Sequence, residues 1–250
     1  RVEKCHVMEN LENQVLPILD GMSAASPLIA EAYRTLYPSQ NAVTVNNAFP
    51  ENLLQREPVL GAGPLKLVWF SQVLGLDRGL EAFLRAMALV PKTPLQLTLI
   101  GLYTPEKVNN ILNKIQSNDH SVHFEEPIPE PKLLQFLAEQ EIGLALEKPE
   151  PRNRDICRTN KLYTYPLAGC YMWASHTAAQ LHFLEEWPQT GQAIQLDKPN
   201  LIAQALDHAF HHREDLLAKR KQTWSLAKSQ LNWETECLPL LDLVDQTLKS

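Results

Sequence analysis

The stretch LKLVWFSQVLGLDRGLEAFLRAMALV (residues 65–90) decides the fold class of this chain. It begins with a short apolar run at residues 65–71. A loop with two glycines leads to residues 77–90, where apolar side chains recur at helical spacing. Short buried runs that alternate with amphipathic helices are typical of βαβ units, in which parallel strands lie between layers of helices. The stretch therefore predicts one such unit.

The same alternation continues beyond residue 90. Further strands are predicted at 95–101, 121–125, 141–147 and 170–175, and helices at 105–116, 131–140 and 161–168. Because crossovers between parallel strands are right-handed, these units predict one α/β domain, a Rossmann-like parallel sheet with helices on both faces. We expect the strand at 170–175 to close the series and residues 147–160 to form a polar loop.

Residues 1 to about 50 show a similar alternation of helices and strands but do not make a whole domain. A helix is predicted at 2–19 and a strand at 20–25. Ser26 is expected to cap a helix that begins with Pro27 and runs to about Tyr37, and a strand follows at 42–48. The Pro- and Gly-rich residues 56–64 read as a linker. The chain begins at Arg1 rather than Met, so we expect that something upstream was removed.

Residues after Gly191 are predicted to be helical. Asp197 is expected to cap a helix that starts near Pro199, a second helix runs through Trp224, and a third runs from 233 to 248. The predicted domains are residues 1–56, the end of an N-terminal α/β domain with its linker; 57–228, the Rossmann-like domain; and 229–250, a C-terminal crossing helix.

Composition excludes several classes of protein. The 250 residues carry a net charge of −6 with no block of lysine and arginine, so nucleic acid is not an expected partner. The basic residues around Arg220 are interpreted as a solvated helix face. The 4 cysteines form no CxxC pattern and predict free thiols in a reducing compartment. No apolar run approaches the roughly 18 residues of a membrane span.

Three loops follow predicted strands and therefore lie at one edge of the sheet, where open parallel sheets bind ligands. They are residues 71–79, with Gly75, Arg78 and Gly79; residues 125–131, stiffened by prolines; and residues 158–169. In the last, Thr159 or Asn160 would cap a helix and Lys161 would add positive charge, which suits a phosphate. Taken alone, the first two loops are better interpreted as ordinary turns, and the third is about as well interpreted as a capped helix with a surface lysine. Their shared edge favours a ligand site.

Other candidates are weaker. His208, His211 and His212 have helical spacing but no evident carboxylate or cysteine partner, so a solvated histidine face is favoured over a metal site. Glu147 and Glu150 are possible acid/base groups, but they lie in a charged loop, where solvated carboxylates are expected. No GxSxG nucleophile motif is present.

The order of these segments resembles the C-terminal half of a GT-B glycosyltransferase of the retaining group 1 type. SQVLGLDRGLEAFLRA resembles that family's strand–glycine–arginine loop, LTLIG its L-x-I-x-G strand, and NKLYTYPLAGCYMWAS its N-K-x-x-E-y-l-A-x-G-x-P segment. Residues 20–50 resemble the end of the family's N-terminal domain and its hinge. The likeness spans nearly all of the chain and rests more on order and spacing than on an invariant motif.

The resemblance implies a donor site for a nucleotide diphosphate sugar, without a required metal or other cofactor. The donor-binding residues expected on this basis are Ser71, Gln72, Gly75, Arg78, Pro127, Ile128, Asn160, Lys161 and Thr164. No catalytic residue is assigned and the acceptor is unknown. We expect a cytoplasmic, bacterial protein, with peripheral membrane contact possible through an N-terminal domain outside this chain.

The chain also departs from the family pattern. Arg78 takes the place of the family's lysine, and Gln72 that of its arginine. Thr164 stands where a glutamate grips the ribose diol, and the other family glutamate falls near Ile156. Pro166 is expected to kink its helix. Each lost charged hydrogen bond typically forfeits about 1.5–3 kcal/mol, so we expect donor binding to be attenuated.

Three functions remain open from the sequence. The first is a hexosyltransferase that acts with retention and stabilises the leaving diphosphate through Arg78 and Lys161; as this fragment, it would bind a donor without turning it over. The second is a non-catalytic, glycosyltransferase-like interaction module, favoured by Gln72, Thr164 and Pro166. The third, a nucleotide-sugar epimerase, would need acid/base groups that we cannot place.

Overall fold

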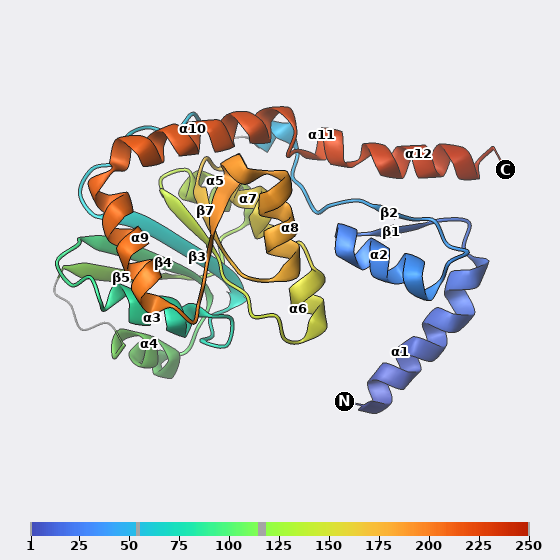
Figure 1. The fold of residues 1–250 in the computed structure, drawn as a ribbon, viewed down its shortest axis with the longest axis horizontal. Helices are drawn as coiled ribbons and strands as arrows, with labels where there is room; N and C mark the ends of the chain where they lie inside the picture. The colour runs from blue at the N-terminus through green and yellow to red at the C-terminus, as the bar shows by residue number, and fades with distance from the viewer. Residues whose placement is uncertain (1, 54–55, 115–118, 250) are drawn as a thin grey trace.

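The computed structural model describes residues 2–53, 56–114 and 119–249. Its main body is a six-stranded, fully parallel sheet in the order β5-β4-β3-β6-β7-β8 (Figure 1). The strands are β3 (Leu65–Val73), β4 (Leu95–Leu102), β5 (His120–Glu125), β6 (Ile142–Ala145), β7 (Tyr171–Ser175) and β8 (Gly191–Ile194). The chain builds the sheet outward from β3 to β5 and then returns to the other side of β3. The strand order therefore reverses between β3 and β6.

Helices cover both faces of this sheet, as the sequence predicts. Alternate residues of β3 point to opposite sides: Leu67 and Trp69 join one core and Val68 joins the other. The first core includes residues of α3 (Leu80–Met87), α4 (Pro105–Leu112) and α9 (Pro199–His211). The second includes residues of α5 (Glu130–Leu137), α7 (Lys161–Leu167), α8 (Ala178–Glu186) and α10 (Arg213–Ser229).

Three elements of the main body differ from the sequence expectation. The strand at 170–175 does not close the series, because α8, a short 3-10 helix (Pro188–Thr190) and β8 follow it. The loop at 147–160 contains a short helix, α6 (Arg152–Ile156). β8 is a four-residue edge strand that is only partly buried, so it has no apolar run to reveal it in the sequence.

Several helix boundaries also differ. Asp197 does not cap α9, which begins at Pro199 with Lys198 in the N-cap position and no side-chain cap. The final predicted helix is divided at Cys237 into α11 (Trp233–Glu236) and α12 (Leu238–Thr247). α4 ends at Leu112, and the predicted end of that helix at Gln116 lies outside the described residues.

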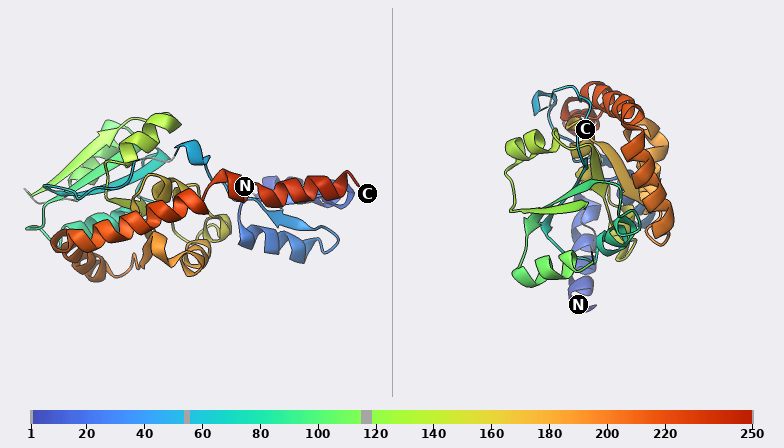
Figure 2. Two further views of the ribbon diagram at one scale, coloured as in Figure 1. Left: turned by 90° about the horizontal axis from the view of Figure 1, so that it is seen from above. Right: turned by 90° about the vertical axis from the view of Figure 1, so that its left-hand side faces the viewer.

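The N-terminal part forms a smaller α/β unit beside the main body (Figures 1 and 2). It contains α1 (Val2–Val15), a 3-10 turn (Leu16–Ile18), β1 (Met22–Ala24), α2 (Pro27–Leu36), β2 (Ala42–Thr44) and a second 3-10 turn (Glu51–Leu53). β1 and β2 pair in parallel. Ser26 precedes α2 but does not cap it, because its hydroxyl donates to the Ile156 carbonyl at 2.6 Å instead. That bond ties the small unit to α6.

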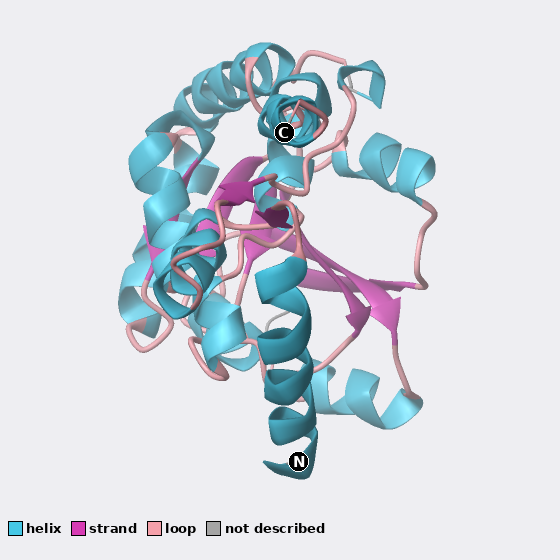
Figure 3. Cartoon of the chain, turned by 90° about the vertical axis from the view of Figure 1, so that its right-hand side faces the viewer, coloured by secondary structure: helices cyan, strands magenta, loops and turns pink. Residues whose placement is uncertain are grey.

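The C-terminal helices return to this small unit. The Asn46 amide donates to the Glu236 carboxylate at 2.8 Å, and the Trp233 N–H donates to the Phe49 carbonyl at 2.9 Å. α12 then runs along the small unit to the C-terminus (Figures 1 and 2), and Figure 3 shows this helix end-on. The chain therefore leaves the small unit once, builds the main body and comes back.

Arg220 does not belong to a solvated face as the sequence indicated. It is 3% exposed, and its guanidinium donates to the carbonyls of Gly169, Val59 and Gln140 at 2.9–3.1 Å. Gly169 lies two residues beyond the end of α7 with φ 72°, in the left-handed region that favours glycine. Arg220 thus joins α10 to the linker and to the turns that follow α5 and α7. Among the described helices, none is long and apolar enough to cross a bilayer.

Candidate functional site

The reversal of strand order between β3 and β6 leaves a crevice at the carboxyl edge of the sheet. Open α/β sheets bind ligands at such a switch point, because the loops on either side diverge there. Here the end of β3 carries Ser71 and Gln72, the loop after it carries Arg78, and the chain after β6 carries Glu147. The start of α7, with Asn160 and Lys161, lies at the same place.

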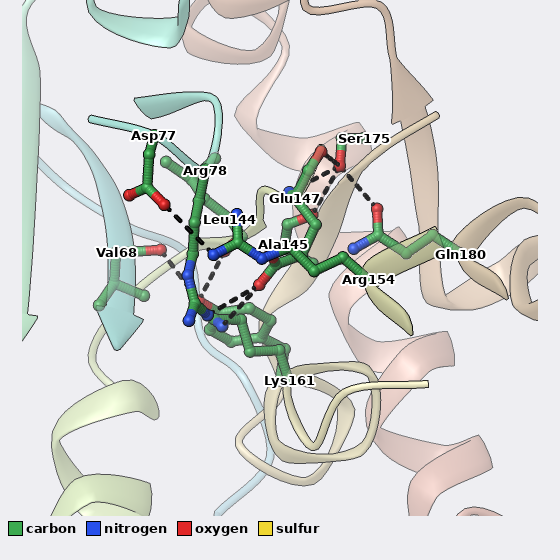
Figure 4. A network of polar contacts seen from close by, with 11 residues as sticks. Val68, Asp77, Arg78, Leu144, Ala145, Glu147, Arg154, Lys161, Ser175 and Gln180 are labelled. Atoms are coloured by element: carbon green, nitrogen blue, oxygen red, sulfur yellow. Dashed lines mark hydrogen bonds and ion pairs between the residues drawn. The ribbon is translucent and has the colours of Figure 1, made fainter. Parts of the chain in front are cut away.

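Glu147 is the centre of a basic cluster in this crevice. Its side chain is 2% exposed, and its Oε1 accepts a hydrogen bond of 3.1 Å from Arg78 Nη1. Lys161 Nζ lies 3.9 Å from the same oxygen, and Arg154 Nε lies 4.0 Å from Oε2 (Figure 4). The expectation of a solvated Glu147 is therefore wrong. Glu150, its companion in that loop, is exposed.

The backbone around Glu147 is also fixed. Its N–H donates to Ser175 Oγ at 2.8 Å, and the same hydroxyl lies 2.7 Å from the Glu147 carbonyl, to which it can donate. Gln180 Oε1 is 2.8 Å from that hydroxyl (Figure 4). Ser175 ends β7, so the two neighbouring strands hold the carboxylate in place.

Lys161 is an ammonium group held in a poorly hydrated position. It is the first residue of α7 and is 4% exposed, and its Nζ lies 5.3 Å from the centre of the Phe70 ring. Burial lowers the pKa of Lys161 to about 8; Glu147 opposes this change and Arg78 adds to it. Close to neutral pH the group is still charged, so it can attract an anion.

Five of the nine predicted donor-binding residues line one cavity of about 340 Å³. They are Ser71, Gln72, Arg78, Asn160 and Lys161, and the wall is completed by Phe70 and Thr159. The capping role expected at Thr159 or Asn160 is not seen. Asn160 takes the N-cap position with helical dihedral angles and no side-chain cap, and the buried Thr159 hydroxyl has no hydrogen-bond partner among the described residues.

The other four predicted residues are not brought into this cavity. Gly75 belongs to the same loop as Arg78 but does not line the wall. Pro127 is exposed and Ile128 packs against the core beyond β5. Thr164 is 2% exposed and donates within its own helix, to the Asn160 carbonyl at 2.8 Å. α7 continues past Pro166 to Leu167, where it ends.

Sequence reasoning missed Arg154 and misread Glu147, which was considered as an acid/base group but expected to be solvated. Arg154 lies on the unpredicted helix α6 and also pairs with Asp77, Nη2 to Oδ2 at 3.2 Å. Glu147 is the last residue of the buried run 141–147, and a carboxylate directly after the apolar residues 142–146 is the signal that could have been used. The signal can be interpreted only with the strand order, because Glu147 comes to lie beside Arg78 only when β6 is the neighbour of β3 in the sheet.

A second cavity, of about 460 Å³, lies at the same sheet edge next to α3. Its wall includes Glu147 and Gly79, together with His176 after β7 and Gln195 after β8. No group of three or more His, Cys, Asp or Glu residues suited to a metal ion occurs in the described parts of the chain. The histidines at 208, 211 and 212 are exposed, with two of the rings stacked at 4.0 Å.

The comparisons with known proteins concern the fold. No protein-family model and no curated protein sequence matches the chain. Among solved structures, sucrose-phosphate synthase from Thermosynechococcus elongatus superposes with a TM-score of 0.70 at 17% identity, over 91% of this chain and 58% of that one. WaaG, a glycosyltransferase involved in lipopolysaccharide biosynthesis, superposes with a TM-score of 0.66 at 13% identity, over 88% of this chain and 61% of its own.

The chain has the fold of the C-terminal half of a GT-B glycosyltransferase. A structure of Anabaena HepE in complex with UDP-glucose is also similar, with a TM-score of 0.71 and 15% identity over 96% of this chain and 67% of that one. The chain thus spans 58–67% of the length of these three neighbours. Sequence identities of 13–17% show the GT-B fold and leave the activity to be argued from the site.

Proposed function

We propose that the chain binds a nucleotide diphosphate sugar in the 340 Å³ cavity and supplies the donor site of a retaining glycosyltransferase. The observation that carries this proposal is the meeting of Arg78 and Lys161 on the wall of one cavity at the switch point of the sheet. A guanidinium and an ammonium at one wall suit the oxygens of a diphosphate, because charge-assisted hydrogen bonds to phosphate are stronger than neutral ones.

The charges of the cluster support this ligand. Arg78, Arg154 and Lys161 contribute three positive charges, against the two carboxylates of Glu147 and of Asp77, which pairs with Arg154. A surplus of one positive charge remains, which favours an anionic ligand. In a transfer reaction the same groups would stabilise the charge that develops on the leaving nucleoside diphosphate.

The neighbours support the same ligand class. The HepE structure contains UDP-glucose, and the other two neighbours carry names of sugar-transferring enzymes. With its fold and its basic cavity, the chain fits a glycosyltransferase better than the interaction module or the epimerase. Retention, metal independence and a cytoplasmic location stay predictions, and no acceptor is assigned.

The structure also bears on the expected weakening of donor binding. Gln72 lines the cavity, so its amide can still donate a hydrogen bond where an arginine would pair. Thr164 is buried and its hydroxyl is used within α7, so it is not free to hold a ribose diol. We therefore place most of the donor affinity in the diphosphate rather than in the ribose.

Thermal unfolding with a panel of ligands tests the proposal. UDP, GDP, ADP and TDP, each with a matching sugar conjugate, are added at micromolar to millimolar concentration, with the nucleoside monophosphates as controls. We expect a saturable rise of Tm for the diphosphates of one base, lost in Lys161→Ala and retained in Arg56→Ala, whose side chain is 63% exposed on the surface. No rise at millimolar ligand would contradict donor binding and favour an interaction module.

A further inference from the structure

Glu147 lies beyond the end of the hydrogen-bonded part of its strand. The last residues that pair between β6 and β7 are Ala145 and Ala174, so the ladder stops two residues before Glu147. A backbone segment that leaves a ladder loses its regular partners, and its N–H and carbonyl groups must find others. The position of this buried carboxylate therefore depends on contacts outside the ladder.

The side chain of Ser175 supplies these contacts. Its Oγ accepts a hydrogen bond of 2.8 Å from the Glu147 N–H, and the Glu147 carbonyl lies 2.7 Å from the same oxygen (Figure 4). A further acceptor for this hydroxyl is Gln180 Oε1, at 2.8 Å, from the first turn of α8. A single buried hydroxyl thus meets both backbone polar groups of Glu147.

Ser175 belongs to a rigid part of the sheet. It is the last residue of β7 and pairs with Ile194 of β8, so the neighbouring strand holds its backbone. Its side chain is buried and lines neither the 340 Å³ cavity nor the 460 Å³ cavity. Ser175 therefore does not contact a ligand in either cavity, and an effect on binding must pass through the residues that its hydroxyl holds.

A displacement of Glu147 would affect two cations at once. Its Oε1 accepts a hydrogen bond of 3.1 Å from Arg78 and lies 3.9 Å from Lys161 Nζ, and both cations line the 340 Å³ cavity. Groups that bind a ligand must be held within about 0.5 Å of their productive geometry by the residues behind them. A loosely held Glu147 would therefore leave both cations poorly aligned for a diphosphate.

We propose that Ser175 is a positioning residue of the diphosphate site: its hydroxyl fixes the backbone of Glu147, and the fixed carboxylate aligns Arg78 and Lys161. The inference rests on the proposed function, because it concerns how the same cavity holds its ligand. Ser175 acts through Glu147 and does not touch the diphosphate.

The test compares the loss of this hydroxyl with the loss of another buried one. Ser175→Ala removes it, and Ser175→Cys replaces it with a thiol, which is only a weak donor and acceptor. Thr223→Val is the matched control, because the buried Thr223 hydroxyl donates to the Gln189 carbonyl at 2.7 Å and lines neither cavity. Isothermal titration calorimetry gives the Kd of UDP, GDP, ADP and TDP, and thermal unfolding shows that each variant is folded.

A second measurement needs no ligand. NMR titration of ¹³C-labelled lysine side chains gives the pKa of Lys161, whose signal is identified by its absence from Lys161→Met. Burial lowers this pKa to about 8, while Glu147 raises it and Arg78 lowers it further. A Glu147 that has lost its fixed position supports the ammonium group less, so the pKa of Lys161 should fall. A loss of stability alone would not change it.

We expect Ser175→Ala to weaken binding of the diphosphate about tenfold, the lower end of the effect of one charged hydrogen bond. The pKa of Lys161 should fall below its value of about 8 in the unmodified protein. Ser175→Cys should change both quantities in the same direction and by less, and it replaces Ser175→Ala in the test if that variant does not fold. Thr223→Val should change neither quantity.

Three results would overturn the role of Ser175: an unchanged Kd in Ser175→Ala, a weaker Kd with an unchanged pKa of Lys161, or changes of equal size in Thr223→Val. If the unmodified protein binds no nucleoside diphosphate, the proposed function fails separately. The titration of Lys161 then still decides whether Ser175 positions Glu147. A lower pKa of Lys161 in Ser175→Ala supports that role, and equal pKa values refute it.

Discussion

Arg78 Nη1 donates a hydrogen bond of 3.1 Å to Glu147 Oε1, and this contact joins the loop after β3 to the chain after β6. The bond crosses the point where the strand order reverses, so it spans the crevice in which this fold class binds ligands. Arg78 is 35% exposed, whereas Glu147 is buried. The buried carboxylate thus orients the guanidinium, which remains accessible to a ligand on its exposed side.

Arg78→Ala should weaken binding of a nucleoside diphosphate about ten- to a hundredfold, because one charged hydrogen bond typically contributes about 1.5–3 kcal/mol. Calorimetric titration measures the change in Kd. Arg56→Ala serves as the control, since it also removes an arginine from the chain, at an exposed site that pairs with Glu139. Equal Kd values for Arg78→Ala and the unmodified protein would remove Arg78 from the site.

Lys161 predicts a pH dependence of both binding and stability. Its pKa is about 8 in the folded chain against an ordinary 10.5, because burial disfavours the charged form. Between these two values the unfolded chain binds more protons, so the contribution of Lys161 to stability rises as pH increases from about 8 to 10.5 and is flat below 8. Binding of a diphosphate should weaken over the first part of this range, as the charge is lost.

The comparison with Lys161→Met isolates this effect from the tyrosines and cysteines that titrate nearby. The free energy of unfolding, measured with urea between pH 7 and 10, should rise for the unmodified protein relative to the variant. A difference that stays constant across this range would mean that the pKa of Lys161 is not lowered.

Gly143 lies beneath the site at a position where the packing leaves no room for a larger residue. A Cβ at this position of β6 would lie 2.3 Å from the Tyr165 ring, whose hydroxyl donates to the Leu144 carbonyl at 3.0 Å. Gly143→Ala should therefore cost about 1–3 kcal/mol of the free energy of unfolding. In a Tyr165→Leu background the cost should fall, since the smaller side chain makes room. Equal costs in both backgrounds would show that Tyr165 is not the obstacle.

Substitution of Arg213 is expected to lower the stability of the chain without changing the ligand site. This arginine pairs with the buried Glu141 and also donates to the carbonyls of Gly63 at 2.7 Å and Pro64 at 3.2 Å. These contacts lie at the start of β3 and β6, at the opposite edge from the crevice. Arg213→Ala should destabilise the chain by about 3 kcal/mol, because it leaves a buried carboxylate unpaired. Denaturant unfolding measures the loss, and calorimetry should show an unchanged diphosphate Kd.

The regular part of the fold follows from the sequence for a physical reason. The central strands are buried on both faces and therefore appear as apolar runs, such as residues 65–70 and 142–146. The sequence pattern does not reveal β8 and α6, because β8 is a short edge strand and α6 is a five-residue helix among charged residues. Local pattern identifies an element only where burial imposes one.

The site is predictable only in part. Arg78 and Lys161 could be found because loops after parallel strands share one edge of the sheet. Glu147 and Arg220 were read as solvated, since a charged residue among charged neighbours usually is. Their burial follows from contacts with residues 69 and 51 positions away, respectively, as in Arg78–Glu147 and Arg220–Gly169. Such partners follow from strand order and helix packing, which the local sequence does not reveal.

The position of the diphosphate tests the central claim most directly. A crystal structure of the chain with the nucleoside diphosphate that stabilises it most would locate both phosphorus atoms. The account predicts the diphosphate in the cavity lined by Arg78 and Lys161, with their nitrogen atoms within hydrogen-bonding distance of its oxygens. A nucleotide bound elsewhere on the chain, with the Arg78–Glu147 bond intact and no ligand beside it, would contradict the account.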